Sequence, residues 1–157
     1  MKLNPIQKNN ILEEFQQEYG TSLLSLVLIG SYARGTATAH SDVDILVVVK
    51  KLPSSYSEKT ERISKHRLSL LKKFSLSFDV ILLEKEDVLA NIEHLSPLFA
   101  SLALGFDIIY DYSNFFKKNA KLLLTRLTEE EFRFGGKEVI WNLQQEATNM
   151  LNSPALS

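Results

Sequence analysis

Residues 30–49 read GSYARGTATAHSDVDILVVV, and this stretch decides the fold. It follows the apolar run Leu23–Ile29 and itself ends in a second apolar run, Ile45–Val49. Apolar runs of this length, bounded by turn residues, are typical of buried strands. The glycine and serine at its start predict a turn directly after the first strand. A strand, a turn and a second strand, over 42–49, therefore form the centre of the expected structure.

Helical and strand patterns alternate outward from this centre. We expect a first helix that begins at Pro5, with Asn4 as its N-cap, and ends at Gly20. Further helices are expected over residues 55–74, 85–94, 97–104 and 114–127 and near the C-terminus, and further strands over 76–83 and 106–110. This alternation predicts an α/β (α+β) sandwich. We expect one domain over residues 1–157, with a core at about 22–83 and a helical extension at about 85–151.

Composition excludes several classes of protein. The chain has 157 residues, of which 45% are apolar and 24% charged, as in an ordinary globular domain. It has no cysteine, which excludes disulfide scaffolds, thiolate metal sites and cysteine catalysis. Lys and Arg total 18 against 19 acids, so global charge does not favour nucleic acid binding. The polar N-terminus does not resemble a signal peptide, and we expect a cytoplasmic protein.

Two features of the central stretch suggest a site for phosphate and metal. Gly30 allows close approach of a ligand, and Ser31 adds a hydroxyl and backbone N–H groups, although the same pair is common in ordinary turns. Asp42 and Asp44, two residues apart on a strand, would place two carboxylates on one face, about 7 Å apart. A pair of magnesium ions would offset their repulsion, whereas a solvated strand end would need none.

A third acid, Asp79, interrupts the apolar run of a later strand. Aspartate is disfavoured in strands and is seldom buried without a partner. If its strand lies beside the one that carries Asp42 and Asp44, its carboxylate joins the same site. If the strand is an edge strand, Asp79 simply faces water, and the residue alone does not decide between these readings.

Together these residues form the pattern Gly-Ser, ten residues, Asp-x-Asp, and a third acid downstream. The pattern resembles the nucleotidyltransferase superfamily that includes DNA polymerase β, and in particular the minimal nucleotidyltransferases. The resemblance implies a mixed central sheet of about 3–5 strands flanked by helices. A P-loop is excluded, because Thr36 stands where that motif requires lysine.

The resemblance also implies a reaction and its site residues. The expected enzyme transfers a nucleoside monophosphate, AMP from ATP, to an acceptor and releases pyrophosphate. Asp42, Asp44 and Asp79 would be catalytic and would bind two Mg²⁺ or Mn²⁺ ions. Nucleotide phosphates would bind at the turn, through the residues Gly30, Ser31 and Arg34, although an exposed arginine also occurs without any such role.

Minimal nucleotidyltransferases are commonly antitoxins, so the resemblance implies a HEPN-type toxin as partner and a toxin hydroxyl as acceptor. A small-molecule or RNA acceptor, or a non-catalytic binding module on the same fold, stays open as an alternative, and so does a homo-oligomer. Residues 50–73 carry eight basic and two acidic side chains, which suits phosphates, an acidic partner or simply a solvated helix face. Nucleic acid is not favoured, because no aromatic residues alternate with the basic ones after Tyr56.

Overall fold

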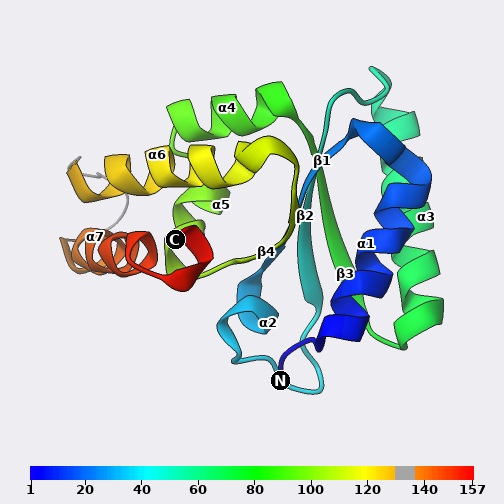
Figure 1. Ribbon diagram of the computed structural model, residues 1–157, viewed down its shortest axis with the longest axis horizontal. Helices are drawn as coiled ribbons and strands as arrows, with labels where there is room; N and C mark the ends of the chain where they lie inside the picture. Colours follow the sequence, from blue (N-terminus) through cyan, green and yellow to red (C-terminus); the bar gives the residue numbers. More distant parts are fainter. Residues whose placement is uncertain (130–136) are drawn as a thin grey trace.

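The computed structural model describes residues 1–129 and 137–157 and contains a four-stranded sheet with helices on both faces (Figure 1). The strands are β1 (Leu23–Ile29), β2 (Val43–Val49), β3 (Phe78–Glu84) and β4 (Asp107–Asp111). The helices are α1 (Pro5–Tyr19), α2 (Gly30–Arg34), α3 (Tyr56–Phe74), α4 (Lys85–Glu93), α5 (Pro97–Ala100), α6 (Phe115–Glu129) and α7 (Lys137–Leu151). The expected mixed α/β architecture is therefore confirmed.

The strands lie in the order β3-β2-β1-β4. β1 is antiparallel to both β2 and β4, whereas β2 and β3 are parallel. A parallel pair needs a long crossover, and the 19 residues of α3 supply it. Within the described chain β3 pairs only with β2, so it forms one edge of the sheet.

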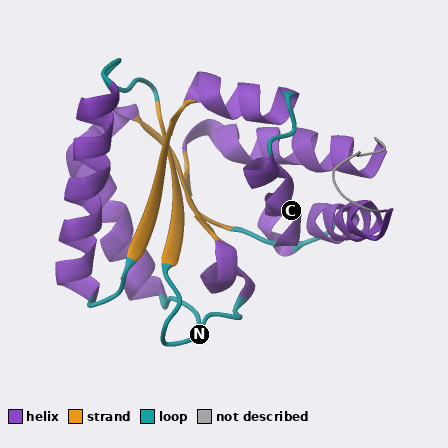
Figure 2. Cartoon of the chain, turned by 180° about the vertical axis from the view of Figure 1, so that it is seen from behind, coloured by secondary structure: helices purple, strands orange, loops and turns teal. Residues whose placement is uncertain are grey.

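The two faces of the sheet are covered by different helices. α1 and α3 cover one face, and α4 to α7 cover the other (Figures 1 and 2). Alternate residues of β2 supply the two cores: Ile45 and Val47 face α1 and α3, whereas Leu46 and Val48 face α4 to α7. All seven residues of β1 are buried, as expected for a strand covered on both faces.

The helix ends explain most of the boundaries. Asn4 and Gln7 form a reciprocal capping box at the start of α1, and Gly20 ends that helix with a φ of 50°. Ser75 ends α3 in a left-handed conformation, with a φ of 54°. This turn delays the following strand, which begins at Phe78 and not at Leu76 as expected.

A buried polar cluster joins α1 to α3. The hydroxyl of Tyr19 lies 2.9 Å from Nε2 of His66, and Nδ1 of His66 lies 3.7 Å from Oε1 of Glu14. Ser69 and Lys73 both donate to Oε2 of Glu14, at 3.0 and 2.5 Å respectively.

Burial shifts the pKa values of this cluster. It lowers the pKa of His66, an effect that the charge of Glu14 partly offsets, and it raises the pKa of Tyr19 to about 12. Burial disfavours the charge of Glu14, but the bonds from Lys73 and Ser69 outweigh it and lower the pKa of that carboxyl.

Asp111 joins the sheet to the helices of the second face. Its Oδ1 accepts hydrogen bonds from the hydroxyl of Ser25 in β1, at 2.7 Å, and from the N–H of Phe116, at 2.8 Å. Its Oδ2 accepts the N–H of Lys117, at 2.9 Å. One carboxylate thus satisfies the first free N–H groups of α6 and holds that helix against the central strand.

Over the part of the chain that the structure describes, no helix combines the length and the apolar character needed to cross a membrane.

Candidate active site

The turn between β1 and α2 brings the backbone close to an acidic side chain. Gly30 begins α2 with a φ of 67°, a left-handed conformation that favours glycine. A Cβ atom at this position would overlap Oδ2 of Asp44 and would lie 3.0 Å from its Cγ. The N–H groups of the first turn of a helix have no partner within the helix. The turn therefore places free backbone donors directly beside the Asp44 carboxylate.

The three acids lie on neighbouring elements of the sheet. Asp44 and Asp79 are partners in the parallel register of β2 and β3, whose strands run about 4.8 Å apart. Asp42 directly precedes β2, which begins one residue later than expected. Asp44 is half-buried, whereas Asp42 and Asp79 are exposed. The structure thus places Asp79 on an edge strand with its side chain exposed, and also beside Asp44 in the register of the sheet.

The carboxylates of Asp44 and Asp79 point toward the face of the sheet that α4 to α7 cover. Asp44 alternates with Val43 and Ile45, which face α1 and α3, so its carboxylate points to the opposite side. Asp79 likewise shares its face with Ile81, which packs against the core on the α4 to α7 side. The two carboxylates therefore face the same side of the sheet.

The electrostatics of Asp44 couple it to the other charged residues of the candidate site. Burial raises the pKa of its carboxyl, and the negative charges of Asp79 and Asp42 raise that pKa further. The positive charge of Arg34 acts in the opposite direction. The charges of Asp42, Asp79 and Arg34 thus all act on the carboxyl of Asp44.

Metal binding can be judged from the donor set. In residues 1–129 and 137–157, no group of three or more histidine, aspartate or glutamate side chains is already arranged to hold an ion. Carboxylate oxygens are the ligands that Mg²⁺ prefers, and Mg²⁺ usually takes one or two of them together with substrate phosphates. The repulsion that raises the pKa of Asp44 is also what a cation would relieve. The residues therefore fit Mg²⁺, or the similar Mn²⁺, held jointly with a nucleotide.

A glycine far away in the sequence, Gly105, leaves room for the side chain of Arg34. The arginine side chain is exposed at the end of α2, three residues after Ser31. Gly105 has a φ of 133°, and a Cβ atom there would lie 3.3 Å from Cγ of Arg34. The sequence identified Gly105 only as a helix stop, because no spacing rule connects it to residue 34. The structure adds it as a residue that leaves room for the arginine.

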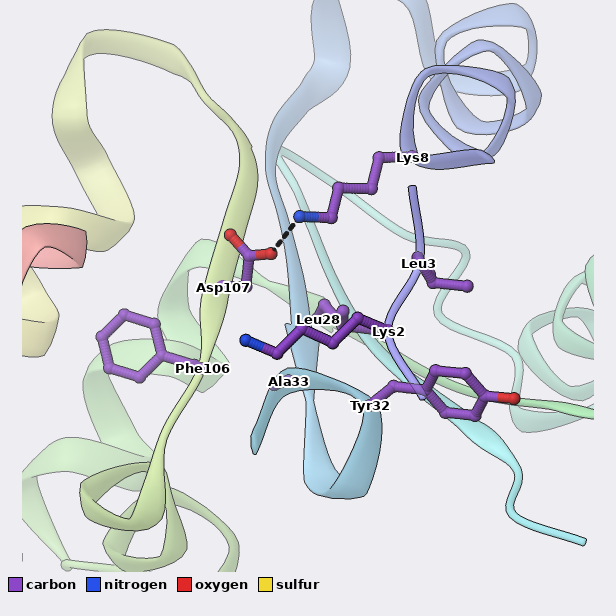
Figure 3. A pocket seen from close by; sticks show the side chains of 8 residues that line it. All are labelled: Lys2, Leu3, Lys8, Leu28, Tyr32, Ala33, Phe106 and Asp107. Atoms are coloured by element: carbon purple, nitrogen blue, oxygen red, sulfur yellow. Dashed lines mark hydrogen bonds and ion pairs between the residues drawn. The ribbon is translucent and has the colours of Figure 1, made fainter. Parts of the chain in front are cut away.

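A cavity of about 200 Å³ lies beside α2, next to the candidate site (Figure 3). Its lining comprises Lys2, Leu3, Lys8, Leu28, Tyr32, Ala33, Phe106 and Asp107. Figure 3 shows Lys8 reaching Asp107, to which its Nζ is bound at 2.5 Å, and Lys2 extending between α2 and β4. None of the site residues that the sequence predicts lines this cavity. Its lining comes from α2, β4 and the N-terminal segment, where the ion pair of Lys8 and Asp107 ties α1 to β4.

Comparisons with known families and proteins agree with the chemistry that the geometry of the candidate site indicates. A family model described as "Nucleotidyltransferase domain" matches residues 8–98. A protein of Methanocaldococcus jannaschii, named as a candidate protein adenylyltransferase, is 38% identical over 113 residues, which cover 69% of this chain and 76% of that protein. A second protein of the same organism and description is 34% identical over 76 residues, 46% of this chain and 71% of that protein.

Solved structures share the fold. A chain in the crystal structure of a toxin–antitoxin pair with AMP-PNP superposes with a TM-score of 0.54 and 14% identity, covering 92% of this chain and 95% of that chain. A chain in the structure of tri-AMPylated Shewanella oneidensis HEPN toxin in complex with MNT antitoxin superposes with a TM-score of 0.51 and 13% identity, covering 94% of each. At these identities the likeness concerns the architecture of the sheet and its helices.

Proposed function

The chain belongs to the nucleotidyltransferase domain family, and on that basis we propose that it transfers AMP from ATP to a hydroxyl of a partner protein. The names of the two archaeal relatives support a protein acceptor. The structural neighbours that contain HEPN toxin and MNT antitoxin support a toxin of the HEPN type as the partner. The chain would then act as the antitoxin. A cytoplasmic location agrees with this role, because ATP and such a partner meet there.

One observation carries the chemical part of the proposal: the contact between the Gly30 turn and the Asp44 carboxylate. A turn with free N–H groups binds phosphate, and a carboxylate binds a divalent cation. Phosphate and cation must be adjacent in a metal–nucleotide complex. The structure supports this arrangement, because it allows no side chain between the two groups.

The turn and the arginine bind the substrate in this scheme. The N–H groups of Gly30 and Ser31 and the hydroxyl of Ser31 hold the β- and γ-phosphates of ATP. Arg34, one helical turn after Ser31, adds a positive charge to the same phosphates. These contacts leave the α-phosphate over the acids, on the side of the sheet that faces α4 to α7.

The acids would hold the metal and direct the acceptor. Asp42, Asp44 and Asp79 would hold two Mg²⁺ ions together with the nucleotide. When bound, the ions neutralise the charge that develops on the attacking oxygen and on the leaving pyrophosphate. Asp79, which is exposed on the edge strand β3, accepts the proton of the acceptor hydroxyl. A new bond then joins that oxygen to the α-phosphorus, the bond to the β-phosphate breaks, and pyrophosphate leaves.

The acceptor is expected to come from outside the chain. The helices after β3 bury their apolar side chains against the sheet, as shown by Phe116, Leu123 and Leu127. These buried side chains cover the domain's own core and are not available to bind an acceptor. Recognition of the acceptor would therefore depend on the surface of a partner protein.

Incubation with α-labelled ATP, Mg²⁺ and the co-purifying partner tests the proposal. We expect the partner to gain the mass of one or more adenylyl groups, and Asp44→Ala to abolish the gain while the variant stays folded. Labelled RNA or a labelled small molecule would instead favour the alternative acceptors. Tight partner binding without transfer would favour a binding module, and normal transfer by Asp44→Ala would contradict the mechanism.

A further inference from the structure

The outer surface of α3 exposes apolar side chains that do not contribute to either core. Leu68 is 53% exposed and Leu71 is 47% exposed. They line a groove of about 250 Å³ together with Arg67, Ser77 and Phe78, between α3 and the start of β3. We call these five residues the α3 groove. Neighbouring exposed apolar side chains that are rimmed by polar residues mark surfaces that bind other proteins.

Basic side chains lie on and next to the α3 groove. Arg67 lines it, and Lys72 directly follows Leu71, within a segment, residues 50–73, whose net charge is +6. Lys73 and Lys65 are paired with Glu14 and Glu61. In the described part of the chain, no ion pair joins Arg67 or Lys72 to an acid, and both flank the exposed leucines in the sequence. The groove therefore combines apolar contact area with uncompensated positive charge.

The α3 groove lies next to the third acid of the candidate site. Nε of Arg67 donates to the carbonyl oxygen of Phe78, at 3.0 Å, and this bond ties the wall of the groove to the edge strand β3. Asp79 directly follows Phe78, so their Cα atoms are about 3.8 Å apart, and its side chain is exposed on the other face of the strand. Only the edge of β3 separates the groove from the carboxylate.

We propose that the α3 groove binds an extended partner segment with apolar and acidic side chains and delivers the acceptor hydroxyl to Asp79. This inference rests on the proposed function. ATP approaches from the side of α4 to α7, where the acids face. The acceptor arrives from the α3 side and crosses the edge of β3.

A peptide fits this surface better than nucleic acid does. Sequence-tolerant binding of single strands relies on aromatic side chains that stack on the bases, and none lines the groove except Phe78, which is buried. Two exposed leucines match leucine or isoleucine side chains of a peptide. Arg67 and Lys72 match aspartate or glutamate placed beside them.

The test uses three fluorescent peptides of about 12 residues, each with one tyrosine. The first flanks the tyrosine with Leu and Glu, the second with Leu and Lys, and the third with Ser and Glu. Binding to the full chain is measured by anisotropy without ATP, and AMP transfer is measured by mass with Mg²⁺ and ATP. Variants are Leu71→Glu and Lys72→Glu. The matched control is Leu122→Glu, since Leu122 is 55% exposed on α6, away from the groove.

We expect the Leu/Glu peptide to bind at least ten times more tightly than either of the others. Leu71→Glu and Lys72→Glu should each weaken its binding about tenfold, equivalent to about 1.4 kcal/mol, and Leu122→Glu should leave it unchanged. Both groove variants should still bind Mg²⁺–ATP as the parent chain does. Equal binding of the three peptides, or equal losses in the control and groove variants, would overturn the docking proposal. Selective binding without any AMP transfer to peptide or partner would keep the docking surface and contradict the proposed function.

Discussion

The backbone of Gly30 lies so close to the carboxylate of Asp44 that a Cβ atom at position 30 would collide with it. The register of the sheet explains this proximity, because Asp44 pairs with Ile29, the last residue of β1. The turn that follows Ile29 therefore folds over the acid. The glycine of the motif is required for two reasons, its positive φ and the space that it leaves to the carboxylate.

Replacing Gly30 by alanine is expected to reduce AMP transfer at least about 100-fold, since displacements of about 1 Å in a reacting geometry have effects of this size. The positive φ adds a loss of about 1–2 kcal/mol in the free energy of unfolding. Gly20→Ala is the matched control. Gly20 also has a positive φ, of 50°, but a Cβ atom there meets nothing within 4 Å. This variant should lose stability and keep its transfer rate, as measured by urea denaturation and a labelling assay. Equal transfer rates in the two variants would show that the collision with Asp44 is unimportant.

Removing the charge of Asp44 is expected to stabilise the protein without its substrates. Burial and two neighbouring acids raise the pKa of this carboxyl in the folded chain, so its charged form costs stability as the pH rises through that pKa. Asp44→Asn should therefore have a higher Tm at pH 7.5 in the presence of EDTA, while transfer is lost. Asp79→Asn, at an exposed position, should change Tm little. A lower Tm for Asp44→Asn would contradict the repulsion described here.

Binding of the metal–nucleotide complex provides the complementary measurement. With Mg²⁺ and AMP-PNP at about 100 times their Kd, the parent chain should gain about 2.7 kcal/mol in its free energy of unfolding. We expect Asp44→Asn to lose most of this gain, because the carboxylate can no longer bind the cation. Asp79→Asn should retain much of it and lose transfer rate instead. A full gain in Asp44→Asn would place the cation elsewhere.

Arg34 is expected to affect the KM for ATP more than the fold. Its side chain is exposed, and its removal leaves no cavity in either core. Arg34→Ala should raise the KM for ATP about tenfold, a loss of about 1.4 kcal/mol in binding. Lys121→Ala, which removes an exposed positive charge from α6, is the control. Steady-state kinetics with varied ATP measure the KM of each variant. Similar KM values in Arg34→Ala and Lys121→Ala would show that Arg34 is an ordinary solvated side chain with no role in ATP binding.

The buried cluster between α1 and α3 predicts a dependence of stability on pH. Burial lowers the pKa of His66 in the folded chain below its ordinary value of 6.5. Its contribution to stability is therefore complete above that ordinary pKa and is lost as the pH falls toward the lowered one. The free energy of unfolding should decrease from pH 7.5 to 5.5, and less so in His66→Gln. His94→Gln, at an exposed position, should behave as the parent chain does, and an unchanged decrease in His66→Gln would contradict the assignment.

Most of the sheet could be predicted from apolar runs. The expected first strand, Leu23–Ile29, agrees with β1 at both ends, because all its residues are buried and a glycine follows directly. The third strand was misplaced by two residues. Ser75 adopts a left-handed conformation that sequence rules assign first to glycine, so the turn after α3 was not recognised.

The candidate site was predictable where it depends on local spacing. Gly30, Ser31, Arg34, Asp42 and Asp44 lie within fifteen residues, and their pattern was sufficient to propose a metal–nucleotide site. Contacts made by distant segments were not predictable. No pattern in the sequence indicates that Gly105 lies close to Arg34 or that Lys8 binds Asp107, and the pairing of Asp79 with Asp44 was only one of two readings of the sequence.

The carboxylate of Asp111 has a consequence for how the molecule unfolds. It bonds at the same time to Ser25 in the central strand and to the first turn of α6. Separation of the C-terminal helices from the sheet would leave the buried Ser25 hydroxyl and two helix N–H groups without partners. The helices of this face are thus expected to melt together with the strands, in one cooperative transition detected alike by circular dichroism and by fluorescence. A partner protein that binds these helices would then stabilise the whole catalytic sheet. Dissociation of that partner would expose the helices and the sheet to proteolysis together.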